Sequence, residues 1–129
     1  MTRVAQILCA LFVLVLGGSA IVSIFSPLTI FDPVGFTAVD NYGVTNMRTL
    51  GAPTLSLAIF TAIAAVRKEW LLVLPVSMYF FFNFSARLIS IFAEGYEPVM
   101  LRGLLLTIVL FILSQVALNI FRTSEVSKK

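Results

Sequence analysis

The sequence predicts an all-α fold, a polytopic membrane protein built as a bundle of four transmembrane helices. Of its 129 residues, 60% are hydrophobic and only 12% are charged, and the mean hydropathy is +1.05. A soluble domain does not carry so apolar a composition. Four apolar stretches are long enough to cross a bilayer, at about 4–25, 46–66, 70–92 and 99–121. We therefore expect a single membrane domain over residues 1–129.

The first stretch follows Arg3 and stays apolar through Phe25. A cleaved signal peptide is the alternative, with Arg3 as its charged start and residues 18–20 as a small-residue cleavage site. We favour a membrane-spanning helix because the apolar run continues beyond that site to Phe25.

Residues 26–45 form the longest connection and contain four helix breakers: Pro27, Pro33, Gly35 and Gly43. Phe31, Val34 and Phe36 make this connection too apolar for a free loop. We expect a short segment that lies in the membrane interface or folds back over the bundle.

The second stretch, 46–66, carries small residues at steps of three and four: Gly51, Thr54, Ala58, Ala62 and Ala65. A stripe of small side chains lets two helix backbones approach closely. We therefore expect this helix to be central in the bundle.

The third stretch, 70–92, is apolar except for one polar line whose members share a helix face: Tyr79, Asn83, Arg87, Ser90 and, just beyond, Glu94. A charge in hydrocarbon is costly, so such a face is tolerated only against other helices or a wet cavity. We expect the rest of the chain to cover it.

Basic residues are distributed unevenly between the two ends of the predicted bundle. Six of the nine Lys and Arg fall on the side of both termini and the second loop: Arg3, Arg67, Lys68, Arg122, Lys128 and Lys129. Arg48, Arg87 and Arg102 fall toward the other side, with Asp32, Asp40, Glu94 and Glu97. Cytoplasmic loops carry the excess of Lys and Arg. We expect a multi-pass protein of the bacterial inner (plasma) membrane with both termini in the cytoplasm.

The composition also excludes several classes of chemistry. The chain has no histidine and one cysteine, Cys9, so Ser-His and Cys-His catalysis, His-ligated metal and haem sites and an intrachain disulfide are excluded. Basic residues occur singly or in pairs, which argues against nucleic acid as a partner. We expect no enzyme activity, no catalytic residue, no metal site and no cofactor.

Three short elements resemble a bacterial group of small four-helix membrane proteins of unknown function, related to the DoxX-like proteins. They are residues 46–52 (NMRTLGA), residues 86–90 (ARLIS) followed by 94–98 (EGYEP), and the Asp-Pro pair at 32–33. The resemblance covers nearly the whole chain. It implies a four-helix bundle in which the element around Arg48 pairs with the element around Arg87.

One position departs from that group. Met47 stands where an acidic or other polar residue is common in it, so the resemblance implies no carboxylate role at this position.

Six polar residues form the candidate site: Asn46, Arg48, Asn83, Arg87, Glu94 and Arg102. The functional interpretation is an anion-binding pocket toward the outer leaflet, because guanidinium groups suit carboxylate and phosphate heads. The structural interpretation, which the sequence favours, is that the arginines pair with Asp40, Glu94 and Glu97 and hold the helix ends.

We therefore expect a non-enzymatic membrane protein, either a small accessory or structural subunit of a larger membrane complex or a lipid-binding module. The alternative is an oligomeric transporter or binder of a small amphipathic anion, acting through the outer-side arginine cluster. The partners expected are membrane lipids and either a larger membrane complex or further copies of the chain.

Overall fold

A computed structural model describes residues 1–35, 37 and 40–129, and this part of the chain is helical with no strand. The elements are α1 (Thr2–Phe25), α2 (Pro27–Phe31), the 3-10 turn η1 (Asp32–Val34), α3 (Asn41–Thr49), α4 (Gly51–Arg67), the 3-10 turn η2 (Trp70–Leu72), α5 (Leu74–Glu94) and α6 (Pro98–Val126). Four helical segments are long and apolar enough to cross a membrane: α1, α3 with α4, η2 with α5, and α6. The all-α, four-helix fold of a multi-pass membrane protein is confirmed.

The helices are longer than the apolar stretches from which they were predicted. The second begins at Asn41, because the Asp40 side chain accepts a hydrogen bond of 2.7 Å from the Gly43 amide and caps the first turn. The fourth continues through Val126, five residues past the predicted span. Backbone hydrogen bonding does not stop where the side chains become polar, so hydropathy alone misplaces these ends.

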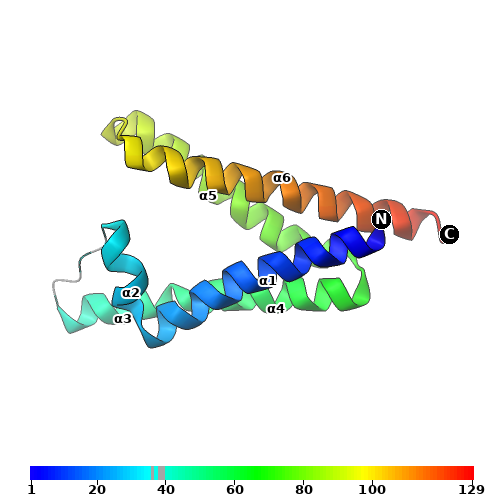
Figure 1. The fold of residues 1–129 in the computed structure, drawn as a ribbon, viewed down its shortest axis with the longest axis horizontal. Helices are drawn as coiled ribbons and strands as arrows, with labels where there is room; N and C mark the ends of the chain where they lie inside the picture. Colours follow the sequence, from blue (N-terminus) through cyan, green and yellow to red (C-terminus); the bar gives the residue numbers. More distant parts are fainter. Residues whose placement is uncertain (36, 38–39) are drawn as a thin grey trace.

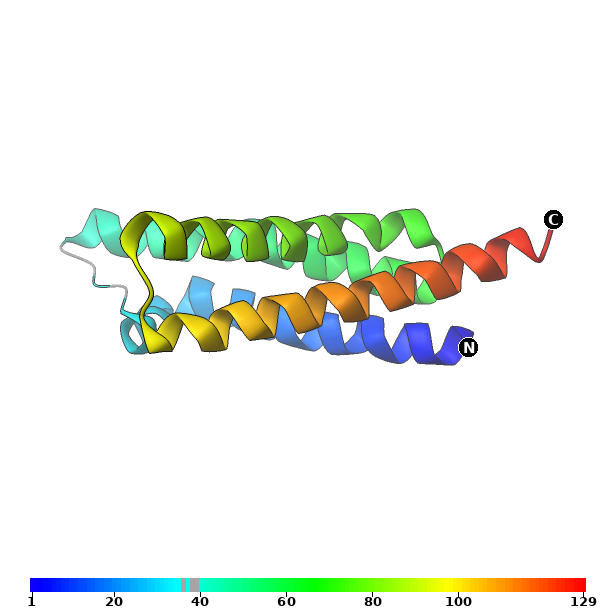
Figure 2. The ribbon, with the colours of Figure 1, turned by 90° about the horizontal axis from the view of Figure 1, so that it is seen from above.

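The four helices form two closely packed pairs, α1 with α4 and α5 with α6, and α6 also packs on α1. Both chain termini and the turn between α4 and α5 lie at one end of the bundle, which we call the termini end (Figures 1 and 2). The turn between α5 and α6 and the segments α2 and α3 lie at the other end, which we call the loop end.

The contact between α1 and α4 is very close because glycines lie at it. A Cβ added to Gly17 would lie 3.6 Å from the Cβ of Ala58, an ordinary contact. A Cβ added to Gly51 would lie only 2.8 Å from the backbone oxygen of Ala20, closer than atoms of this kind pack. The α4 backbone can therefore lie against α1 at this point only because residue 51 has no side chain.

The buried stripe of α4 differs in part from the predicted one. Gly51 and Ala58 are buried as expected, but Ala62 and Ala65 are only half-buried. Thr61 and Ala64 take the innermost positions instead. Helix periodicity defines a broad small-residue face, and the direction of the neighbouring helix selects which part of it is covered.

The core that joins the two pairs lies toward the termini end. Phe12 of α1 and Phe80 of α5 are both fully buried, with ring centroids 5.5 Å apart. Polar contacts within the pairs also lie toward this end: Gln6 of α1 donates to the carbonyl oxygen of Ala65 of α4 (2.8 Å). The guanidinium carbon of Arg122 also lies 5.6 Å from the centroid of the Trp70 ring.

The two pairs diverge toward the loop end (Figure 1). In the described residues, the backbones of α2 and α3 pack on the α1/α4 pair and do not come close to α5 or α6. The first connection thus contains short helices, and α2 packs on α1 and α3. Phe36, which we expected in this segment, lies outside the described residues.

Candidate functional site

The interior face of α5 changes character where the pairs diverge. Phe80 faces Phe12 across the bundle. Arg87 follows Phe80 by seven residues, about two helical turns, so it lies on nearly the same face. Unlike Phe80, it is exposed. It belongs to the half of α5 toward the loop end, where the two pairs diverge (Figure 1), and we call the region between the diverging pairs the opening.

Two neighbours hold the Arg87 side chain. Its Nε donates a hydrogen bond of 2.9 Å to the Oδ1 of Asn83, one turn earlier on α5. Its guanidinium lies over Gly103 of α6, where an added Cβ would lie 3.0 Å from Cζ of Arg87. The bond to Asn83 uses one of the five guanidinium N–H donors, which leaves the terminal nitrogens for a ligand.

The expected ion pairs of the arginines with the acids are not found among the described residues. The one ion pair there joins Arg67 and Glu69 at 3.9 Å, exposed and at the termini end. Asp40 caps α3 instead, and Glu94 accepts a hydrogen bond from the Ser90 hydroxyl. Within the described part of the chain, Arg87 therefore has no carboxylate partner.

Arg48 has a different, structural surrounding. Its Nη1 donates to the carbonyl oxygens of Ile24 and, at 3.3 Å, of Phe25. These are among the last carbonyls of α1, which have no partner within the helix, and a cation there also interacts favourably with the helix dipole. Arg48 therefore joins α3 to the end of α1.

The six predicted site residues do not form one cluster. Asn46, like Arg48, lies on α3, whose backbone does not come close to α5 in the described part of the chain. Arg102 is exposed on α6, and no hydrogen bond or ion pair of its side chain is found among the described residues. Only Asn83 and Arg87 bond to each other, with Glu94 further along the same helix face.

The expectation that the chain covers the polar line of α5 is wrong for this structure. Tyr79, Asn83 and Ser90 are half-buried, and Arg87 and Glu94 are exposed. The line begins at the bundle core and follows one wall of the opening between the two pairs. It is therefore accessible to a ligand or to lipid from the loop end.

A cleft of about 380 Å³ lies between α1, α2 and α4, and Tyr79 of α5 completes its lining. Its lining includes Ser19, Ser23, Ile30, Pro53, Thr54 and Tyr79. The hydroxyls of this set on α1 and α4 donate to backbone carbonyls, those of Leu16, Met47 and Leu50, so the lining offers mainly apolar surface. Arg87 lies two turns beyond Tyr79 on α5, about 12 Å along the axis.

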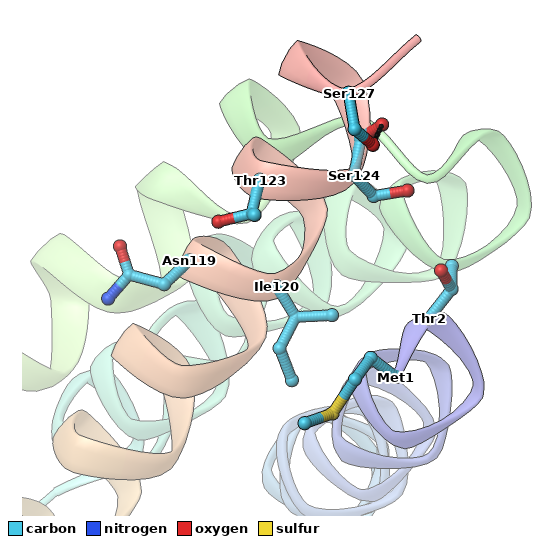
Figure 3. Close-up of a pocket in the computed structure, with 7 residues that line it drawn as sticks. All are labelled: Met1, Thr2, Asn119, Ile120, Thr123, Ser124 and Ser127. Atoms are coloured by element: carbon cyan, nitrogen blue, oxygen red, sulfur yellow. Dashed lines mark hydrogen bonds between the residues drawn. The ribbon is translucent and has the colours of Figure 1, made fainter.

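A larger cleft, of about 420 Å³, lies at the termini end between the start of α1 and the end of α6 (Figure 3). Its lining residues are Met1, Thr2, Asn119, Ile120, Thr123, Ser124 and Ser127. No charged side chain is among them. Its size alone therefore does not indicate a ligand class, whereas the opening at the loop end carries an accessible guanidinium.

Sequence reasoning missed the contribution of Gly103. A glycine inside an apolar helix often marks a position where another group packs directly on the helix backbone, and Gly103 could have been noticed on this ground. Which group approaches it depends on how α5 and α6 pack, and the sequence does not give this. Among the described residues, no group of three or more His, Cys, Asp or Glu is placed to hold a metal ion.

Comparison of the chain with protein-family models, with curated proteins and with solved structures found no match. The relation to the DoxX-like proteins therefore stays a prediction made from the short elements quoted above.

Proposed function

We propose that this chain is a non-enzymatic protein of the bacterial inner membrane that binds the anionic head group of a membrane amphiphile at Arg87. The observation that carries the proposal is the guanidinium on the interior face of α5, exposed at the opening between the helix pairs and without a carboxylate partner in the described residues. An unpaired charge at membrane depth is costly, and an anionic ligand removes that cost.

The surroundings of Arg87 support an amphiphile rather than a soluble anion. The guanidinium suits a phosphate or carboxylate. The cleft between α1, α2 and α4, which reaches Tyr79 on α5, offers mainly apolar surface for a hydrocarbon chain. A head group at Arg87 with its chain directed toward Tyr79 satisfies both parts of the site.

The distribution of basic residues supports an outer-leaflet ligand. Arg3, Arg67 and Arg122 belong to elements that meet at the termini end, which the positive-inside rule assigns to the cytoplasm. The loop end, with Arg87, then opens to the outer leaflet. An alkaline phosphatase fused after Lys129 should be inactive, and a strongly active fusion would reverse this orientation.

The main test replaces Arg87 and measures which lipids stay with the purified protein by native mass spectrometry. Arg87→Ala should lose most of the bound amphiphile. Arg87→Lys should retain less than the native chain because an ammonium lacks the planar fork of the guanidinium. Gly103→Ala should also weaken retention, since its methyl group displaces the guanidinium from its place over α6.

Arg102→Ala is the matched control, because it removes an exposed arginine from the same end of the bundle and should leave the bound amphiphile unchanged. Inorganic phosphate is added in a parallel experiment. If it displaces the amphiphile at millimolar concentration, the site binds a soluble anion rather than a head group. Unchanged retention in Arg87→Ala would refute the proposed function.

A small accessory subunit of a larger membrane complex is the second candidate, and the same opening favours it, because a helix of a partner protein could close the space between the pairs. Purification in mild detergent distinguishes the two. Stoichiometric foreign subunits support the accessory role, whereas a single chain or homo-oligomer with bound amphiphile supports the proposal made here.

A further inference from the structure

The second charge on the wall of the opening is Glu94, and the inference drawn from it rests on the proposed function. Glu94 is the last residue of α5, is exposed, and accepts a hydrogen bond from the Ser90 hydroxyl. It has no cationic partner within ion-pair distance among the described residues. A carboxylate is unfavourable at the negative end of a helix dipole, so this position favours a bound cation.

Arg87 and Glu94 are close enough to contact one head group. Their backbones are about 10 Å apart along the axis of α5. Both side chains turn back by one helical turn, Arg87 to Asn83 and Glu94 to Ser90, so the two charges keep about the spacing of their backbones, which one head group can bridge. The two opposite charges thus occupy one face of α5 without forming an ion pair. Such a pair of unpartnered charges is complementary to a ligand that carries both signs.

We infer that the ligand is a zwitterionic phospholipid with a primary ammonium group, whose phosphate contacts Arg87 and whose ammonium contacts Glu94. A phosphate accepts parallel hydrogen bonds from a guanidinium. A primary ammonium offers three donors to a carboxylate, which a quaternary ammonium lacks. Phosphatidylethanolamine therefore fits the two charges better than phosphatidylcholine or phosphatidylglycerol.

The order of the charges along α5 agrees with the covalent structure of this lipid. Its phosphate is bonded to the glycerol that carries the acyl chains, and its ammonium ends the head group. The anion must therefore bind deeper in the membrane than the cation. Arg87 lies nearer the middle of α5, and Glu94 lies at its end. The cleft reaches Tyr79, which lies deeper on α5 than Arg87, and an acyl chain is expected there.

The test measures lipid selectivity in the full chain. The protein is equilibrated in mixed micelles with equal amounts of phosphatidylethanolamine, phosphatidylglycerol and phosphatidylcholine, and the bound lipids are counted by native mass spectrometry. The native chain should favour phosphatidylethanolamine over each of the others by about threefold, as expected for a solvent-exposed ion pair. Glu94→Gln should bring these ratios to about one.

Glu97→Gln is the matched control, because Glu97 is an exposed acid just before α6 whose side chain does not cap that helix, and it should keep the native ratios. Ser90→Ala keeps the Glu94 charge but removes its hydrogen bond, so the ratios should fall here too, even if Glu94→Gln is unstable. Unchanged ratios in Glu94→Gln and Ser90→Ala, or a native preference for phosphatidylglycerol or phosphatidylcholine, would overturn the inference.

The two proposals fail in different ways. If Arg87→Ala loses all bound lipid while Glu94→Gln keeps the native selectivity, the head-group site stands and the assignment of the ammonium is wrong. If Arg87→Ala retains its lipid, both proposals fail.

Discussion

The termini end and the loop end of this bundle are built from the same four long helices, but the two helix pairs meet only toward the termini end. Toward the termini end, Phe12 and Phe80 pack together and Gln6 joins α1 to α4. Toward the loop end, the interior face of α5 carries Arg87 and Glu94, which are exposed. One helix face thus serves the core over part of its length and forms the wall of an opening over the rest.

The difference shows that an interior-facing position does not ensure burial. A guanidinium needs a partner or water, so it cannot replace Phe80 in an aromatic contact without a large desolvation cost. The face that is apolar in the core becomes polar where the neighbouring pair has moved away. Polar side chains on the inner face therefore indicate where the bundle opens.

Removing the aromatic contact of the core should have the largest effect on stability. Phe80 is 2% exposed and Phe92, twelve residues along the same helix, is 83% exposed. Phe80→Ala should lower the free energy of unfolding by about 3 kcal/mol, and Phe92→Ala by less than about 0.5 kcal/mol. Unfolding by SDS titration measures both. Equal losses would show that the two ends are equally packed.

A methyl group at the closest helix contact should have the next largest effect. Gly51→Ala places a Cβ 2.8 Å from the Ala20 backbone oxygen and should cost about 1–3 kcal/mol, because neither backbone can yield easily. Gly17→Ala meets Ala58 at 3.6 Å, an ordinary contact, and should be tolerated. The same titration compares them. A tolerated Gly51→Ala would mean that α1 and α4 are further apart than described.

The loss of the Arg48 cap should have the smallest effect. Arg48→Ala removes the hydrogen bonds to the last carbonyls of α1 and should cost about 1 kcal/mol. Arg102→Ala, which removes an arginine without such bonds, should change stability by less than about 0.5 kcal/mol. If Arg102→Ala is the more costly of the two, Arg48 is not a cap and the loop end is held together in another way.

The sequence by itself determined the class of the protein, the four apolar helices and the polar line along α5. These follow from hydropathy and periodicity, which are local properties of the chain. It also singled out Arg48, Arg87 and Arg102, but it placed Asn46 and Arg48 in one candidate site with Asn83, Arg87, Glu94 and Arg102, which the structure does not bring together.

Only the tertiary structure decided what each of these residues does. Arg48 bonds to carbonyls 23 and 24 residues earlier in the chain, and the guanidinium of Arg87 rests on Gly103 of another helix. The orientation of α4 relative to its neighbours likewise decides that Thr61 and Ala64 are buried. Such contacts depend on how helices pair and where they diverge. Pairing is a property of complementary surfaces that are distant in sequence, so no local pattern contains it.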